Sequence, residues 1–515
     1  MATKLQTRLA DALERVRACA AKAVVKAATL KRADKELLLK LGYLQEICKG
    51  WYLLTRPGQK PGESTAWYAS FWDFLSVYLD DRFGQDYCLS AISTMDLHVG
   101  QCLIPQQVTV IAARGGAMVL KLPHGTSILV YQDRKNLPAT VEMMNGLRVM
   151  PLTLALARMP ASFFQNSATD AEIALRSVKS VSDLIRVVLE LESPVLAGRL
   201  SGAYAFLGDR QKSREILNAA QAAGLLCEPA NPFEKPAPIF RGQTRLVSPY
   251  AGRIEPLFQT SREAVLKVFA GMPPRRMANP ATYLKQVEVV YEHDAYNSLS
   301  IEGYRVTPEL IAQIRQGSWN PENNLQDQQQ VAAMAAKGYL EAFRLVKESV
   351  WQVLQGKPAA GVAAHDYQLW YRALFSESVR AGLMEAYHLA GHRDGNVFIR
   401  LSRHVPPPPT AVDDVMKAFF DGMQAEKEPI VRAVLGHWLF GFIHPYRDGN
   451  GRVARFLMNL MLASGGYRWT IVRNRRRNEY LNALETASTE LRIEPFARFL
   501  REEMLVDWTR QPAEI

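Results

Sequence analysis

A chain of 515 residues is too long for a single hydrophobic core, so its length predicts two to four domains. Its hydrophobic content of 48% and charged content of 22% are those of an ordinary globular protein and exclude a disordered or fibrous chain. No run of 18 apolar residues suggests a membrane span, and the acidic Asp11 and Glu14 argue against a signal or transit peptide.

The net charge of +11 is concentrated at one end of the chain. Residues 1–60 hold thirteen Lys/Arg and five Asp/Glu, a surplus of eight that leaves +3 for all other residues. Such asymmetry indicates a nucleic-acid contact, although a solvated helix face explains it equally well. The five cysteines are scattered without a CxxC pair, which excludes a disulfide framework and favours a reducing, cytoplasmic location.

The N-terminal segment has helical patterns followed by a hairpin pattern. Residues 5–26 have the spacing of one long basic helix, and a second helix is expected to end at Gly42. Residues 44–54, LQEICKGWYLL, predict two short strands around Lys49-Gly50. Because a winged helix-turn-helix ends with a helix and a hairpin, we expect residues 1–70 to form such a unit, able to contact DNA through residues 1–60.

Residues 71–226 predict a mixed α/β module. The β-rich runs QQVTVIAA and GTSILVYQD are followed by helical spacing over residues 171–225. Prolines crowd residues 227–242 and cannot continue a helix or a central strand, so a linker is expected over residues 227–245. Residues 1–226 loosely resemble an abortive-infection type of antitoxin with a winged helix, which implies DNA binding rather than catalysis.

The nine residues HPYRDGNGR lie between two apolar-rich segments, 429–443 and 452–464, that predict buried helices. Glycines in such a loop can aim several N–H groups at one point beside a helix N-terminus, which makes an anion cradle. His444 is positioned to take a proton from an incoming nucleophile near neutral pH, and Asp448 is a hard carboxylate suited to Mg²⁺. Two arginines three residues apart on the second helix can reach further phosphate oxygens. Cradle, metal ligand and base together predict phosphate-bond transfer.

Extended to HPYRDGNGRVAR, this motif resembles the signature of the Fic family, in which phenylalanine usually stands at the position of Tyr446. The resemblance implies a mainly α-helical Fic fold over residues 246–515 and transfer of AMP from ATP to a Ser, Thr or Tyr hydroxyl of a target protein. It implies that His444 is the general base and that Asp448 holds Mg²⁺ on the phosphates. The nucleotide-binding residues that it implies are Asp448, Gly449, Asn450, Gly451, Arg452, Arg455, Tyr480, Leu481 and Ser488.

A second phrase, NSLSIEG, lies about 140 residues upstream. Ser298 and Glu302 are i,i+4 neighbours that would share one helix face, and Gly303 is a natural C-cap. Beside a Fic motif this phrase is similar to the family's inhibitory helix, expected here at about residues 292–303. The resemblance implies that Glu302 pairs with Arg455 at the γ-phosphate position, so that the protein is repressed at rest. In some relatives the same glutamate helps to remove AMP.

Residues 396–409, NVFIRLSRHVPPPP, predict one strand that leads into a stiff polyproline segment. In Fic proteins a hairpin flap lies here and pairs with the target's backbone as an added strand. The docking residues that this resemblance implies are Arg400, Leu401, Ser402, Arg403 and His404.

Other interpretations stay open. The doublets His293-Asp294 and His365-Asp366 occur in HD-type metal phosphohydrolases, but the further His and Asp of such a site are not evident. A DNA-binding regulator or toxin–antitoxin protein whose Fic part only senses nucleotide fits the basic N-terminus. The nucleotide donor, the target and the oligomeric state, a homodimer included, also stay open. The sequence therefore predicts a multidomain protein with an α/β, winged-helix-containing N-terminal half and a repressed adenylyltransferase.

Overall fold

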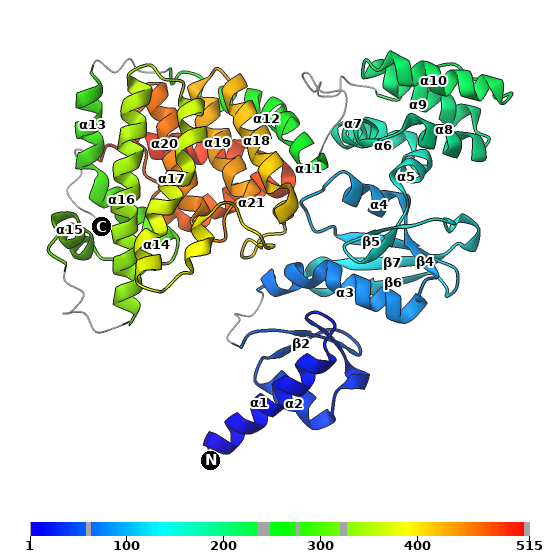
Figure 1. Cartoon of the computed structure of the whole chain (residues 1–515), viewed down its shortest axis with the longest axis horizontal. Coiled ribbons are helices and arrows are strands. Elements are labelled where there is room, and N and C mark those ends of the chain that lie inside the picture. The colour runs from blue at the N-terminus through cyan, green and yellow to red at the C-terminus, as the bar shows by residue number, and fades with distance from the viewer. Residues whose placement is uncertain (1, 58–62, 234–247, 274–278, 320–326, 509–515) are drawn as a thin grey trace. The chain divides into compact units, whose positions relative to one another are not determined.

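The computed structural model describes residues 2–57, 63–233, 248–273, 279–319 and 327–508, which belong to two compact units. The first unit comprises residues 1–249 and 398–405, and the second comprises residues 250–397 and 406–515. Figure 1 draws both units, coloured along the chain, and labels many of their elements. Every helix among the described residues is too short or too polar to cross a membrane.

The first unit begins with two helices and a small antiparallel sheet of order β1-β3-β2. The elements are α1 (Ala2–Cys19), β1 (Val24–Lys26), α2 (Arg32–Lys40), β2 (Leu44–Cys48) and β3 (Trp51–Leu54). The expected hairpin of β2 and β3 is confirmed. The single helix expected over residues 5–26 is wrong, because Lys22 takes a left-handed backbone and the buried, β-branched Val24 and Val25 pair with β3 instead.

The boundary expected at residue 70 is also wrong, because it falls inside the helix α3 (Thr65–Phe83). Two aromatic rings of α3 pack edge-on against Trp51 of β3, with centroid distances of 6.1 Å to Phe74 and 5.7 Å to Tyr78. One hydrophobic core therefore joins the N-terminal sheet to the rest of the unit.

The second sheet of this unit has the order β4-β5-β7-β6. Its strands are β4 (Tyr87–Leu89), β5 (Gln107–Ala112), β6 (Met118–Lys121) and β7 (Ser127–Gln132), and a hairpin of β8 (Glu142–Met144) and β9 (Leu147–Val149) follows. The two β-rich runs of the sequence are confirmed as β5 and β7, which pair in parallel. Along β5, Val108 and Val110 join the core beneath α3, while Ile111 faces the opposite core.

Helices complete the first unit, as expected for residues 171–225. They are α4 (Ala91–His98), α5 (Leu152–Arg158), α6 (Ala161–Asn166), α7 (Ala168–Ser177), α8 (Val181–Glu190), α9 (Pro194–Phe206) and α10 (Arg210–Ala222). The expected linker begins too early, because Ala230 N–H donates to the Gly198 carbonyl of α9 at 2.9 Å and Phe233 is buried. Residues 234–245 of that expected linker lie outside the described part of the chain.

The second unit is mainly α-helical, as expected, and no strand occurs among its described residues. Its helices are α11 (Pro249–Gly252), α12 (Ile254–Val268), α13 (Pro280–Val289), α14 (Tyr291–Ile301), α15 (Pro308–Gln316), α16 (Asp327–Leu354), α17 (Ala359–Arg380), α18 (Val412–Ala425), α19 (Pro429–Ile443), α20 (Asn450–Ser464), α21 (Arg477–Glu490) and α22 (Glu494–Met504). The apolar helix α20 packs among α16, α17 and α19 (Figure 1). The loop that enters α20 is thereby held by the most buried part of the unit.

The strand expected within residues 396–405 is wrong. Leu401 takes a left-handed backbone, with φ of 62°, which interrupts an extended run. Only His404 makes a bridge, with Leu103 of the same unit.

Candidate active site

His444 ends α19 as its C-cap, in a left-handed backbone conformation with φ of 52° and ψ of 59°. Its Nδ1 lies 3.1 Å from the carbonyl oxygen of Gly441. Because a carbonyl oxygen can only accept, Nδ1 carries the proton and Nε2 is left with its lone pair. The residue is half-buried rather than sealed from solvent. Its tautomer is the one that a general base requires.

The electrostatic surroundings keep this imidazole neutral. Burial lowers the pKa of His444, and the positive charge of Arg393 acts in the same direction. The hydrogen bond to Gly441 and the carboxylates of Glu302 and Asp448 oppose the shift without reversing it. A lowered pKa means that the ring is unprotonated at neutral pH and able to accept a proton.

The glycine-containing turn of the motif is closed by its own side chains. The Tyr446 amide donates to Asn450 Oδ1 at 3.0 Å, and Asn450 Nδ2 donates to the Tyr446 carbonyl at 2.8 Å. Gly449 has φ of 83°, and a Cβ on it would lie 2.7 Å from the ring of Phe375. Asn450, which the resemblance implies to be nucleotide-binding, thus holds the turn through its side chain, and Gly449 is required sterically.

Tyr446 occupies the position where the Fic signature usually has phenylalanine. It is 1% exposed, and its ring stacks on Tyr371 with a centroid distance of 3.6 Å and an interplanar angle of 4°. Its hydroxyl has no hydrogen-bond partner among the described residues, so the partner expected for a buried tyrosine is missing.

Arg452 is fully buried between two aromatic rings. Its guanidinium carbon lies 4.7 Å from the ring centre of Phe375 and 5.2 Å from that of Tyr304. Nη2 is 3.2 Å from Asp448 Oδ1, an ion-pair distance without hydrogen-bond alignment. None of its three side-chain nitrogens has a hydrogen-bond partner in the described structure. Buried charged donors in this condition are suited to bind the oxygens of an anionic ligand.

Arg455 is held by the end of α14. Its Nη2 donates to Glu302 Oε1 at 2.7 Å, and its Nε donates to Ser298 Oγ at 2.9 Å. The side chains of Arg455 and Glu302 are 4% and 24% exposed. The prediction that Ser298 and Glu302 share one helix face is confirmed, and Gly303 follows with φ of 91°. A Cβ placed on Gly451 would lie 2.4 Å from Glu302 Oε1, so this carboxylate covers the expected anion cradle.

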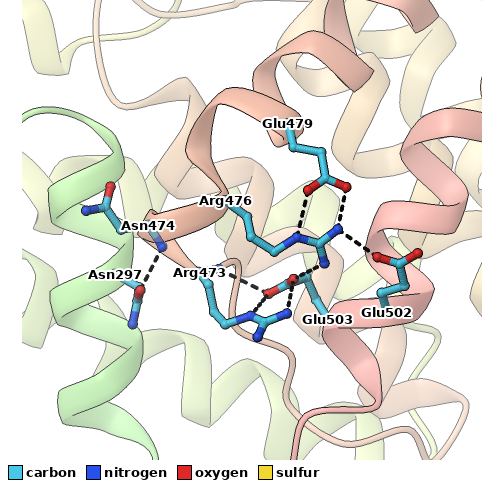
Figure 2. Close-up of polar contacts among 7 residues, drawn as sticks. All are labelled: Asn297, Arg473, Asn474, Arg476, Glu479, Glu502 and Glu503. Carbon is cyan, nitrogen blue, oxygen red and sulfur yellow. Dashed lines mark hydrogen bonds and ion pairs between the residues drawn. The ribbon is translucent and has the colours of Figure 1, made fainter. Parts of the chain in front are cut away.

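A polar network that the sequence did not reveal anchors α14 through Asn297 (Figure 2). The amide of Asn474, in a short 3₁₀ turn before α21, donates to Asn297 Oδ1 at 2.8 Å. This turn is fixed by Arg473 and Arg476, which donate to the buried carboxylate of Glu503 in α22 at 2.8 and 2.6 Å. The complementary charges of RNRRR and REE were the available sequence signal.

The three residues expected near the nucleoside all lie on α21. The Tyr480 hydroxyl is buried 2.8 Å from His437 Nε2, and Ser488 Oγ accepts from Trp438 Nε1 at 3.0 Å. Leu481 is exposed. The structure therefore turns Tyr480 and Ser488 into the packing with α19, and their contact with a nucleoside stays a prediction.

The segment expected to dock a target, residues 400–404, belongs to the first unit. The Ile104 amide donates to the Arg403 carbonyl at 3.1 Å, and the Val405 amide donates to the Cys102 carbonyl at 2.8 Å. Arg400 lies 3.3 Å from Glu63, and the Leu401 amide donates to a threonine hydroxyl. Ser402 and His404 are buried. The backbone of this segment is thus already hydrogen-bonded within its unit.

The aspartates of the two His-Asp doublets are hydrogen-bonded to other side chains. Asp294 is buried and accepts from the Tyr339 hydroxyl at 2.7 Å, while Asp366 contacts His365 at 2.6 Å and a serine. Among the described residues, no group of three potential metal-ligating His, Cys, Asp or Glu side chains is present. The doublets therefore have structural partners in place of a shared metal.

Residues 363–462 match the model of the Fic/DOC family, which confirms the resemblance for the segment that holds the motif. Protein adenylyltransferase Fic of Nematostella vectensis is 37% identical over 125 residues, 24% of this chain and 29% of its own length. The same-named protein of Drosophila willistoni is 39% identical over 101 residues, 19% of this chain and 20% of its own length. The chain thus matches less than a third of these curated relatives.

The solved structure of Fic-1 from C. elegans is 18% identical, covers 69% of this chain and 96% of that chain, and superposes with a TM-score of 0.34. A score this low adds no argument to the sequence match. The antitoxin and winged-helix resemblance of residues 1–226 is not confirmed by these matches.

Proposed function

We propose that this chain is a protein adenylyltransferase, which transfers AMP from ATP to a Ser, Thr or Tyr hydroxyl of a target protein. The curated relatives named above support the activity over the segment that carries the motif. The observation that carries the proposal is the tautomer of His444, whose Nε2 retains its lone pair, in the same motif as Arg452, a buried arginine without hydrogen-bond partners among the described residues.

In the proposed reaction, His444 Nε2 accepts the hydroxyl proton while the hydroxyl oxygen forms a bond to the α-phosphorus of ATP. The bond between that phosphorus and the oxygen bridging to the β-phosphate breaks, and pyrophosphate leaves with the electron pair. Arg452, buried and sandwiched between aromatic rings, would neutralise charge on the phosphates without the cost of losing its own hydration during the reaction.

Asp448 is the residue that would hold Mg²⁺. Its side chain is 50% exposed and close to Arg452, and Mg²⁺ is commonly held by one or two carboxylates together with substrate phosphates. The described residues fit this mode, in which the protein supplies a single carboxylate. The bound ion would supply neutralisation of phosphate charge.

Glu302 is proposed to keep the site inactive. Its carboxylate accepts a hydrogen bond from Arg455 and fills the space over Gly451. The outer phosphates of ATP would require both this guanidinium and this space. ATP would then bind without its productive contacts until α14 moves. If the site also removes AMP, Glu302 is the carboxylate beside the cradle that would orient the attacking water.

The DNA-binding role expected for residues 1–60 remains a separate prediction, as do the cytoplasmic location and the homodimer. Several of the basic residues there are already ion-paired with acidic side chains of the same unit, which reduces the charge available to phosphates. The pairs are Arg15–Asp34, Lys22–Asp73, Lys26–Asp81 and Arg32–Glu36.

Three versions of the protein test the proposal: wild type, Glu302→Ala and Glu302→Ala/His444→Ala. Each is incubated with Mg²⁺ and ATP labelled on either the α- or the γ-phosphate, and self-labelling is followed by mass spectrometry. We expect an AMP adduct and α-label only in the single variant. Equal labelling in all three versions, or transfer of the γ-label, would refute an adenylyl transfer based on His444.

A further inference from the structure

Arg393 lies in the segment between α17 and α18 and is 5% exposed. Its backbone amide donates to the Pro445 carbonyl at 2.9 Å, and its Nε donates to the His444 carbonyl at 2.8 Å. Its Nη1 and Nη2 donate to the carbonyls of Gly395 and Pro407 at 3.0 and 2.5 Å. One buried side chain therefore joins the loop after His444 to the start of the polyproline segment.

The residue next to Arg393 makes a contact of a different kind. Asp394 forms an exposed ion pair with Arg447, at 2.5 Å. Exposed ion pairs contribute little to stability. Asp394 is therefore a suitable control position, because it lies along the same loop but does not bind the backbone of His444.

The backbone of His444 needs such support. A residue other than glycine in the left-handed region is strained, and this conformation persists only where neighbouring groups over-determine it. The His444 amide is held by the Phe440 carbonyl at 3.0 Å, and its own carbonyl is held by Arg393. Without the guanidinium, the peptide after His444 loses the donor that fixes its orientation.

We propose that Arg393 is a positioning residue for His444, acting through the main chain of the catalytic loop rather than through the nucleotide. This inference rests on the proposed function, since it assigns a partner to the proposed base. A displacement of about 1 Å between reacting groups can lower a rate about 100-fold, so a loosened imidazole should reduce kcat. The nucleotide contacts of Arg452 and Arg455 are independent of Arg393, so the KM for ATP should change little.

The charge of Arg393 has a second effect on the same ring. The charged groups that act on His444 are Arg393, which lowers its pKa, and Glu302 and Asp448, which raise it. Loss of the Arg393 charge removes a repulsion against the protonated imidazole. The pKa of His444 should therefore rise, and the acidic limb of the pH–rate profile should move to higher pH.

The test compares Arg393→Gln, Arg393→Lys and Asp394→Asn in the Glu302→Ala background of the full chain, with AMP self-labelling as the assay. We expect kcat to fall about 10- to 100-fold in both Arg393 variants, with the KM for ATP within about threefold of the background. Only Arg393→Gln should shift the acidic limb upward, because lysine retains the charge. Asp394→Asn should behave as the background.

A readout independent of activity is the pKa of His444 from NMR titration of ¹³C-labelled histidine, assigned with His444→Ala. A rise in the pKa of His444 in Arg393→Gln but not in Arg393→Lys supports the inference. This holds even if the Glu302→Ala background shows no AMP labelling, because that result would reject only the proposed function. An unchanged His444 pKa in Arg393→Gln together with an unchanged kcat would overturn it. A fall in kcat in Asp394→Asn as large as that in the Arg393 variants would overturn it as well.

Discussion

Because Glu302 and Arg455 form an ion pair, we expect Glu302→Ala to lower the stability of the second unit and ATP binding to restore part of it. Removing one member of a buried ion pair costs about 3–5 kcal/mol, because the remaining charge is left uncompensated. Glu302 is 24% exposed and Arg455 keeps its bond to Ser298, so we expect the lower end of that range for Glu302→Ala. At about 2–4 °C per kcal/mol for a unit of this size, the Tm of the second unit should fall by about 6–12 °C.

The phosphates of ATP should restore what this substitution removes. ATP at about 100 times its Kd stabilises a protein by about 2.7 kcal/mol, which would recover most of the loss in Glu302→Ala. In the wild type the gain should be smaller, because the nucleotide must first displace the carboxylate from Arg455. Thermal unfolding with and without Mg²⁺ and ATP measures both effects.

Glu292→Ala is the matched control for this experiment. It makes the same substitution on the same helix, but Glu292 is 43% exposed and pairs with Arg315 at 3.0 Å, a surface contact that contributes about 0–1 kcal/mol. Its Tm should fall by no more than a few degrees, with the ATP response of the wild type. A Glu302→Ala protein that melts with the wild type, or equal stabilisation of the wild type and Glu302→Ala by ATP, would refute this role of the ion pair.

Three further outcomes are expected from unfolding experiments. Tyr446→Phe should raise the unfolding free energy by about 1 kcal/mol, because it removes a buried hydroxyl that has no hydrogen-bond partner among the described residues. Tyr283→Phe is its control and should lower the unfolding free energy by about 1 kcal/mol, because it removes a hydroxyl that donates to a carbonyl at 3.0 Å. Glu503→Gln should lower the Tm of the second unit, since it leaves the half-buried guanidinium groups of Arg473 and Arg476 without the buried carboxylate that they share (Figure 2); an unchanged Tm would contradict this. Burial raises the pKa of Asp294 to about 6, so the contribution of this carboxyl group to stability is present below its ordinary pKa of 3.8 and is lost as pH rises through 6. Asp294→Asn should therefore flatten the dependence of stability on pH over that window. A dependence as steep as that of the wild type would be inconsistent with this role of Asp294.

Local patterns in the sequence predicted the elements that depend on local spacing. The helix that precedes His444 was expected at residues 429–443 and is found there, because its apolar run ends at a loop rich in glycine. The i,i+4 relation of Ser298 and Glu302 predicted their shared face, since helical geometry determines it. The hairpin around Lys49-Gly50 was predictable for the same reason.

Features that depend on distant partners were not predictable from local patterns. Val24 and Val25 continue a helical spacing in the sequence, but a strand 27 residues later pairs with them and decides their conformation. Arg393 stands in a loop without periodicity, and only the fold brings it to the carbonyl of His444. The two hydrogen bonds between the Asn450 side chain and the Tyr446 backbone, which close the turn, also could not be predicted without the three-dimensional structure.

The hydrogen bonds between residues 102–104 and residues 403–405 have a consequence for any polypeptide that would pair with residues 403–405 as an added strand. The incoming polypeptide competes with residues 102–104, which belong to the same chain as residues 403–405. Segments tethered in this way act at effective concentrations of about millimolar. Its apparent affinity is then the intrinsic affinity scaled by the fraction of molecules in which the edge is open. Amide hydrogen exchange at Ile104 and Val405 measures that fraction, so the protection of two main-chain protons would show how far an added strand is excluded from these residues.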